Sequence, residues 1–194
     1  MARVVVGISG ASGMILAWRT LVALGDLGFD IECVMTSSAS YTAALELGKE
    51  FSSLQKMVLQ LPKKVQDRVK IHNINDIGSS ICSGTYKTAG MVVIPCSMAS
   101  LAAISMGLSD NTLRRAADVT LKEGRPLVIV PREMPFGQIH LENMLHLSKL
   151  GAVILPPIPG WYAKPKSFEE MENFIVGRVL DHLKIEHSLY QEWN

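Results

Sequence analysis

Residues 4–13, VVVGISGASG, give the clearest indication of the fold. It begins with a short apolar run rich in valine, which is typical of a strand buried on both faces. Small residues and two hydroxyls, Ser9 and Ser12, follow directly, so that a tight turn leads to the N-terminus of a helix. Backbone N–H groups at such a terminus can bind an anion, although a tight turn by itself also calls for glycine.

The spacing of the glycines distinguishes two kinds of nucleotide site. Gly7, Gly10 and Gly13 lie three residues apart, which gives GxxGxxG and not the GxGxxG of dinucleotide-binding folds. No acidic residue ends the next apolar run, residues 31–35, where a dinucleotide fold holds the ribose. The pattern therefore favours a mononucleotide over NAD.

Short apolar runs alternate with segments of helical period along the chain. The runs are rich in Val and Ile, and they cover residues 4–8, 31–35, 91–95, 126–131 and 152–158. The helical segments cover Ile15 to Leu27, Met98 to Met106, Thr112 to Lys122, Ile139 to Leu150 and Phe168 to Leu183. This alternation predicts an α/β fold with a doubly wound, mainly parallel sheet and helices on both faces. We expect one domain over residues 1–185 and a C-terminal tail over 186–194, whereas residues 48–80 give no clear pattern.

Charge and cysteine content exclude several functional classes. Nineteen Lys and Arg against eighteen Asp and Glu give a net charge of +1 without a basic stripe, so nucleic acid is not an expected partner. The three cysteines show no CxxC spacing and the five histidines no HxxxH pattern, which argues against disulfides and against a metal site. A reducing cytoplasm is the expected location.

Hydropathy predicts an oligomer and no membrane span. The N-terminal MARVVVGISG lacks the features of a secretion signal, and Pro95 and Gly107 interrupt the uncharged segment 91–108. A mean hydropathy of +0.22 is high for a monomer. It suggests large buried interfaces between copies.

Hydroxyl groups also follow two further predicted strands. Thr36–Ser38 come after the run at 31–35, and Ser97–Ser100 come after the run at 91–95. Carboxyl ends of parallel strands meet at one edge of a sheet, where such folds bind ligands. Each hydroxyl could instead be a helix N-cap, and Cys96 at the same edge is expected to be a small buried residue and not a nucleophile.

A charged run follows in the next helical segment. Arg115 and Lys122 fall on one face of the predicted helix, where a surface ion-pair ladder with Asp118 would look the same. Arg132 and Glu133 end the run at 126–131, at the ligand edge of the sheet. An unpaired charge is costly there, so a cation at this edge is expected to meet an anion.

Five blocks of the sequence resemble, in order, those of the UbiX/Pad flavoprotein family. They are GISGASG (7–13), SGTYKTAGMVVIPCSMASLAAI (83–104), GLSDNTLRRAADVTLKEGRPLVIVPREMP (107–135), IHLENMLHLSKLGAVILPPIPGWYAKP (139–165) and VGRVLDHL (176–183), with residues 39–78 weakly matched. The resemblance implies a flavodoxin-like Rossmann fold, dodecamers built from trimers, and FMN bound between subunits. It also implies transfer of a dimethylallyl group from dimethylallyl monophosphate to N5 and C6 of reduced FMN. The product would be the cofactor of UbiD-type decarboxylases.

The resemblance further implies a role for each matching residue. The flavin contacts would be Gly10, Ala11, Ser12, Ser37, Ser97, Met98, Ala99, Ser100 and Arg132. The prenyl phosphate would be bound by Arg115, Lys122, Arg132, Glu133, Tyr162 and Arg178. Lys122 would stabilise the leaving phosphate, Tyr86 would offer a π face to the allyl cation, and Ser12 would relay the N5 proton. Glu133 or the released phosphate would take the C6 proton, and no metal is needed.

The sequence differs from the family pattern at two places, and two alternative functions are considered. The family's PAFYHRP is PGWYAKP here, residues 159–165, and CSMKT has become CSMAS, residues 96–100. One rival is a non-catalytic FMN-binding partner of a decarboxylase, which would not need a second phosphate cluster. The other is a flavin-dependent Cys-decarboxylase, whose catalytic histidine and PxSANT-like segment this chain lacks.

Overall fold

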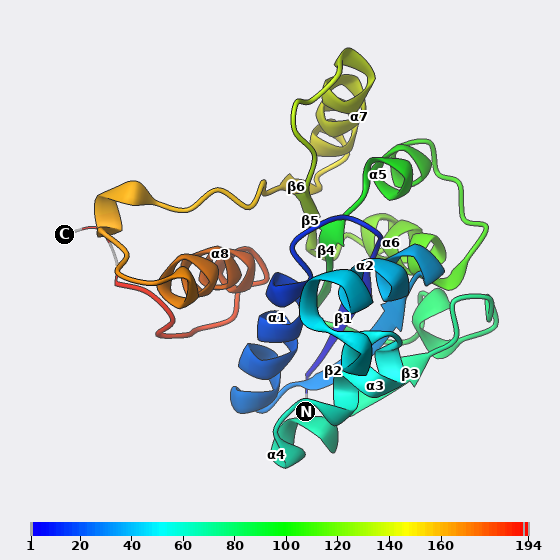
Figure 1. The fold of residues 1–194 in the computed structure, drawn as a ribbon. Helices are drawn as coiled ribbons and strands as arrows, with labels where there is room; N and C mark the ends of the chain where they lie inside the picture. The colour runs from blue at the N-terminus through cyan, green and yellow to red at the C-terminus, as the bar shows by residue number, and fades with distance from the viewer. Residues whose placement is uncertain (1, 192, 194) are drawn as a thin grey trace.

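A six-stranded parallel sheet forms the centre of the computed structural model, which describes residues 2–191 and 193 (Figure 1). The strands are β1 (Arg3–Ile8), β2 (Asp30–Met35), β3 (Val69–His72), β4 (Gly90–Cys96), β5 (Leu127–Pro131) and β6 (Val153–Ile154). They are ordered β3-β2-β1-β4-β5-β6, and every neighbouring pair is parallel. The predicted α/β fold is confirmed.

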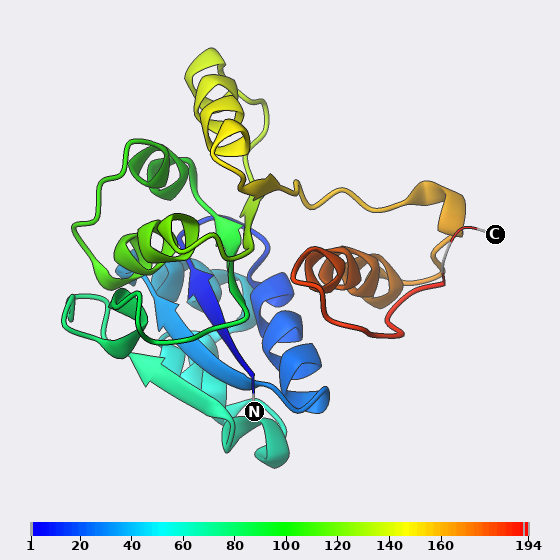
Figure 2. The same ribbon diagram turned by 180° about the vertical axis from the view of Figure 1, so that it is seen from behind.

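Alternate residues of the strands enter two hydrophobic cores, one on each face of the sheet. Val4, Val6 and Ile8 of β1 enter the first core, whereas Val5 enters the second. The first core is covered by α1 (Met14–Asp26), α2 (Ser37–Leu47), α3 (Leu54–Leu59), α4 (Lys63–Gln66) and α8 (Phe168–His182). The second is covered by α5 (Met98–Ser105), α6 (Thr112–Lys122) and α7 (Gln138–Lys149), and Figure 2 shows α5 and α6 in green over this face. Burial on both faces explains why the strands read as unbroken apolar runs.

The region between β2 and β4, for which the sequence predicted little, contains α2, α3, α4 and β3 and two short 3-10 helices. These are η1 (Lys49–Phe51) and η2 (Ser80–Cys82). Thr36 and Ser53 cap α2 and α3. Their side-chain oxygens accept hydrogen bonds from the backbone N–H groups three residues later in the chain. β3 is an edge strand of four residues with only His72 buried, so its apolar signal is weak.

The strand predicted over residues 152–158 was wrong in its extent. β6 covers only Val153–Ile154, because the following Pro156 and Pro157 have no N–H to donate to a sheet ladder. The chain continues as an arm to a 3-10 helix, η3 (Trp161–Ala163), before α8 begins (Figure 1).

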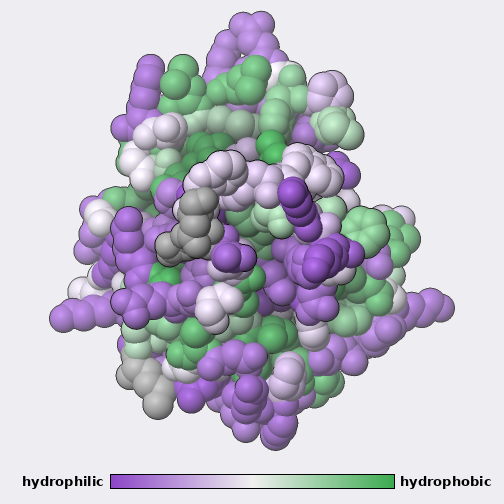
Figure 3. Space-filling view, turned by 90° about the vertical axis from the view of Figure 1, so that its left-hand side faces the viewer, coloured by the Kyte–Doolittle hydropathy of each residue, from purple (hydrophilic) through white to green (hydrophobic). Residues whose placement is uncertain are grey.

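One helix, α7, projects at the top of Figure 1, where its inner side packs on α5 and β6. Its surface carries exposed Ile139, Leu141 and Leu145, and Figure 3 shows hydrophobic side chains on this upper part of the molecule. Among the described helices, none combines the length and the apolar character needed to span a bilayer.

The strand order reverses direction between β1 and β4, since β2 and β3 lie on one side of β1 and β5 and β6 lie beyond β4. The loops after these two strands, residues 9–13 and Ser97, therefore diverge to opposite faces of the sheet. A crevice at such a reversal is where open parallel sheets bind ligands.

Candidate active site

Backbone and side-chain hydrogen bonds join the loops after β1 and β4 at the strand reversal. Ser9 donates its N–H to Pro95 O at 3.2 Å, and its Oγ accepts from Ser97 N at 2.8 Å. Ser97 in turn caps α5, because its Oγ accepts from Ser100 N at 3.3 Å. Ser9 is fully buried, so the two loops are fixed relative to each other. The predicted flavin contacts of these loops thus lie on one continuous rim.

The loop after β1 also approaches the start of α2. A Cβ atom at Gly10 would lie 2.4 Å from Ser38 Oγ and 2.6 Å from Ser38 Cβ, so only glycine fits. Gly13, with φ of 101°, has the left-handed conformation that favours glycine. This close approach brings Gly10, Ala11 and Ser12 beside Ser37, in the first turn of α2. Three of the strand ends predicted from the sequence therefore meet.

A carboxylate that the sequence did not point to occupies the N-terminus of α1. Glu46, in the last turn of α2, accepts hydrogen bonds from Gly13 N at 3.0 Å and Met14 N at 2.8 Å. It lies in the weakly matched segment 39–78, and nothing in the local pattern marks it. The contact shows that these N–H donors attract negatively charged oxygen, and Glu46 takes them up within the chain itself. The glycine cradle at Gly10 remains as the feature of this turn that suits close approach of FMN.

A pocket of about 400 Å³ lies after β5. Its walls are mainly apolar, and they include Met134, Phe136 and Ile158. Arg132 and Glu133 supply its charge, and Arg132 N donates to Cys96 O at 3.1 Å, which links the pocket to the loop after β4. Among the described residues, no carboxylate forms an ion pair with Arg132. This is the unpaired cation that was predicted at the ligand edge.

Lys122 does not join Arg132 within one chain. α6 begins at the carboxyl edge of the sheet and returns to the amino edge, so Lys122 precedes β5 whereas Arg132 follows it. The five residues of β5 alone separate the two edges by roughly 17 Å at the usual rise per residue. Arg115 lies at the start of α6 and pairs with Asp118 at 2.6 Å, as the ion-pair alternative predicted.

Tyr162 and Arg178 also lie away from the pocket after β5. Tyr162 belongs to η3 at the end of the arm, and Arg178 belongs to α8, which packs on α1 (Figures 1 and 2). The Tyr162 ring contacts Phe174 of α8 edge-on, with 6.1 Å between the ring centroids. Arg178 pairs with Asp181 at 2.7 Å. The arm and α8 thus form a second group, separate from the strand edge.

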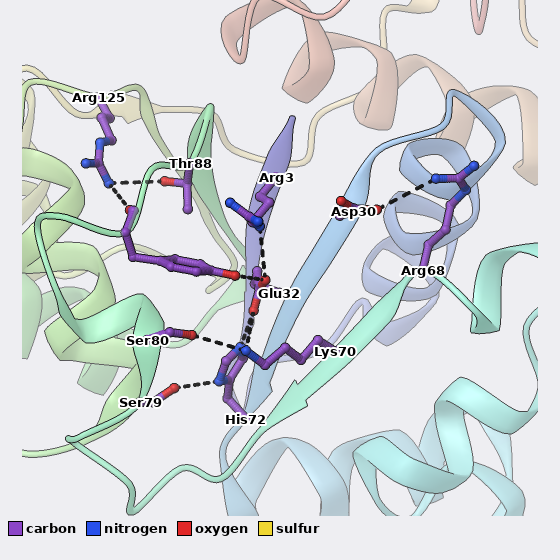
Figure 4. A network of polar contacts seen from close by, with 11 residues as sticks. Arg3, Asp30, Glu32, Arg68, Lys70, His72, Ser79, Ser80, Thr88 and Arg125 are labelled. Atoms are coloured by element: carbon purple, nitrogen blue, oxygen red, sulfur yellow. Dashed lines mark hydrogen bonds and ion pairs between the residues drawn. The ribbon is translucent and has the colours of Figure 1, made fainter. Parts of the chain in front are cut away.

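Tyr86 was expected to offer its ring to the substrate, and in a single chain the structure places it before β4, at the amino edge of the sheet. Its hydroxyl donates to Glu32, a buried carboxylate of β2. Glu32 also forms ion pairs with Arg3 and Lys70, and Figure 4 shows these two cations converging on it. The two cations cover the Tyr86 ring at 4.8 Å and 5.7 Å from its centroid. Burial and the bond to Glu32 raise the pKa of Tyr86. A buried carboxylate needs such donors, so Glu32 fixes the position of the Tyr86 hydroxyl.

Comparison with known proteins gives consistent matches over the whole chain. A model of the family described as Flavoprotein matches residues 1–180. The flavin prenyltransferase UbiX of Chlamydia trachomatis is 46% identical, with 100% of this chain and 98% of that protein covered. That of Methanocaldococcus jannaschii is 42% identical over 98% of each chain.

Two solved structures are similar in fold and sequence. One is AnUbiX (PadA1) in complex with FMN and dimethylallyl pyrophosphate, with 39% identity, a TM-score of 0.88 and coverage of 100% of this chain and 97% of that one. The other is a dodecameric FMN-dependent Ubix-like decarboxylase from Escherichia coli O157:H7, with 40% identity, a TM-score of 0.89 and 99% of each chain covered.

Proposed function

The chain belongs to the flavoprotein family and, within it, to the UbiX flavin prenyltransferases, and on this basis we propose that it prenylates reduced FMN. The dimethylallyl group comes from dimethylallyl monophosphate and is added at N5 and C6 of the flavin. The observation that carries the proposal is the pocket after β5, where apolar walls stand beside Arg132 and Glu133, neither of which forms an ion pair within the described residues. Apolar walls suit the dimethylallyl group, and the cation suits a phosphate.

FMN binds along the rim formed by the loops after β1, β2 and β4. The residues that hold it are Gly10, Ala11, Ser12, Ser37, Ser97, Met98, Ala99, Ser100 and Arg132. Gly10 allows close backbone approach, and the N–H groups at the start of α2 favour negative charge. Reduced FMN would supply the nucleophilic N5 and C6 positions, and Ser12 would relay the proton at N5.

Removal of the phosphate is the step that needs fixed cations. Negative charge grows on the leaving oxygen, and preorganised Arg and Lys donors stabilise it more in the transition state than in the bound substrate. We assign this role to Lys122 with Arg115, Arg132, Tyr162 and Arg178. The second bond forms between C6 and the alkene of the dimethylallyl group, which gains a proton at its other carbon. Glu133, which is exposed in the pocket, accepts the proton that C6 then loses.

More than one copy of the chain is required to complete this site. Lys122 and Arg178 lie far from Arg132 in a single chain, and α7 presents exposed Ile139, Leu141 and Leu145, which suit an interface. We therefore propose a homo-oligomer, a dodecamer as in one of the similar structures, in which cations of one copy face the pocket of another.

The product, prenylated FMN, passes in our proposal to a UbiD-type decarboxylase. Buried, unpaired thiols at Cys33, Cys82 and Cys96 suit a reducing cytoplasm. A non-catalytic FMN carrier is less well supported, since it would have no use for an apolar pocket beside Arg132 and Glu133.

Anaerobic incubation of the purified protein with reduced FMN and dimethylallyl monophosphate tests the proposal. Mass analysis of the extracted flavin is expected to detect the prenyl adduct, in amounts that grow with each equivalent of donor. Omission of the protein serves as the control. Recovery of unmodified flavin alone from the complete mixture would rule out prenyl transfer.

A further inference from the structure

The segment after α8, which was expected to be a tail, folds back on that helix and fixes its polar face. Asp181 of α8 accepts at Oδ2 from Tyr190 at 2.5 Å and from Arg178 NH1 at 2.7 Å. Its Oδ1 contacts His187 Nε2 at 3.0 Å. Both oxygens of one carboxylate are therefore engaged, and two of the three donors come from residues 187–190.

The tautomer of His187 follows from a backbone contact. Leu189 donates its N–H to His187 Nδ1 at 3.1 Å, so Nδ1 is an acceptor and the proton of the neutral ring lies on Nε2. Nε2 then donates to Asp181 Oδ1. The imidazole side chain is only 6% exposed, so its orientation is fixed by packing as well as by hydrogen bonds.

Close packing also fixes the ring of Tyr190. A Cβ atom at Gly177 would lie 2.5 Å from Tyr190 Cδ1, so the helix has a glycine where this ring lies against it. The ring also contacts Phe174, with 5.0 Å between centroids, and Phe174 reaches Tyr162 of η3. Tyr190 thus connects, through one further ring, two residues assigned to the phosphate.

Arg178 is fixed on one side only. Its NH1 is engaged by Asp181 and, at 3.2 Å, by the Tyr190 hydroxyl, whereas Nε and NH2 have no hydrogen-bond partner within residues 2–191 and 193. The side chain is 42% exposed. A guanidinium held in this way presents a planar edge of N–H groups to solvent, which is the geometry for binding a phosphate through two bonds.

We propose that Tyr190 and His187 are positioning residues, which act through Asp181 to hold the free edge of Arg178 toward the phosphate of the allylic substrate. The inference rests on the proposed function, because it takes Arg178 as a phosphate ligand. Without Tyr190, the guanidinium would regain rotational freedom that binding must then remove. The alternative explanation is that the contacts of His187 and Tyr190 with Asp181 only stabilise the packing of residues 187–190 on α8.

A double-mutant cycle separates the two explanations. The variants are Tyr190→Phe, which retains the ring and loses the hydroxyl, Arg178→Ala, and the pair together. The measurement is the calorimetric Kd for dimethylallyl monophosphate in protein loaded with oxidised FMN, so that no turnover occurs. We expect Tyr190→Phe to raise this Kd about tenfold, as loss of one hydrogen bond to a charged group does, and by less than about twofold when Arg178 is already Ala.

Fluorescence titration should give an unchanged Kd for FMN in all three variants, and Tyr41→Phe, at an exposed tyrosine of α2, is the matched control. An equal rise in Kd with and without Arg178, or no rise at all, contradicts the positioning role. If wild-type protein forms prenylated flavin but the effects of Tyr190→Phe and Arg178→Ala on the Kd are additive, this inference alone is refuted. Wild-type protein that neither binds dimethylallyl monophosphate nor forms prenylated flavin refutes the proposed function as well.

Discussion

Glu46 Oε2 accepts a hydrogen bond from the backbone N–H of Met14 at 2.8 Å, across 32 residues of chain. This contact ties the last turn of α2 to the first turn of α1, and it places negative charge at the positive end of the α1 dipole.

Replacement of Glu46 by Gln should remove the charge while retaining the size of the side chain. Because Glu46 is exposed, we expect a modest loss of about 0.5–1 kcal/mol in the free energy of unfolding, seen as a fall of about 1–4 °C in Tm. Differential scanning calorimetry of the FMN-free protein measures it. Glu50→Gln, at an exposed carboxylate close by in the chain, is the control and should leave Tm unchanged. Equal Tm values for Glu46→Gln and wild type would argue that the contact contributes nothing.

Glu32 should make folding sensitive to acid. Burial acts to raise the pKa of Glu32, but hydrogen bonds from His72 and Tyr86 and the charge of Lys70 outweigh it, so the pKa lies below its ordinary value. A carboxylate with a lowered pKa stabilises the fold fully above its unfolded value, near 4.5, and this contribution is lost as the pH falls through the folded value.

Urea unfolding of wild type and Glu32→Gln between pH 7 and pH 4 tests this. At pH 7 the variant should be less stable by about 3 kcal/mol, because the cations and His72 lose a buried partner. The difference should narrow at the acid end of the range. A difference that stays constant with pH would contradict the assigned charge state of Glu32.

Gly10→Ala should weaken flavin binding through a steric clash. The added Cβ would meet Ser38, and the loop would have to shift at a cost of about 1–3 kcal/mol. We expect a tenfold or larger rise in the Kd for FMN by fluorescence titration, with partial recovery in Gly10→Ala/Ser38→Gly. Gly137→Ala, where the nearest atom would be 3.8 Å away, is the matched control. Normal flavin affinity in Gly10→Ala would exclude close approach of the flavin at this turn.

The boundaries of α6 were predicted from its sequence, but the position of Lys122 relative to the site was not. The periodicity of residues 112–122 gives the helix, and the parallel sheet then requires the helix to run back to the amino edge. The periodicity places Arg115 and Lys122 on one face of the helix, but it does not show that they lie near opposite edges of the sheet. The loops after β1 and β4 were predicted well, because glycine and serine spacing there reflects the local backbone.

Long-range contacts account for what the sequence could not reveal. Tyr86 is drawn to Glu32 across 54 residues, and Glu46 reaches α1 from a helix without a predicted start. The strand β3 is short and half-exposed, so its alternation could not be told from a loop. Residues 187–190 carry no apolar period, and only the folded chain brings them to Asp181.

Lys122→Ala and Arg132→Ala should each slow prenyl transfer by on the order of a hundredfold or more, as loss of one preorganised donor does elsewhere. The measurement is the single-turnover rate of phosphate release under anaerobic conditions. Lys63→Ala, at an exposed ion pair of α4, is the control and should keep the wild-type rate. Unchanged rates in both active-site variants would mean that the phosphate lies elsewhere.

The central claim is that cations from different copies of the chain gather around one flavin and one allylic phosphate. Its most direct test is the prenylation rate of oligomers assembled from equal amounts of the Lys122→Ala and Arg132→Ala chains. Random assembly gives roughly a quarter of the sites both wild-type side chains if the two come from different copies, so roughly a quarter of the wild-type rate should return. A mixed oligomer of wild-type size that remains as inactive as either parent would contradict the account.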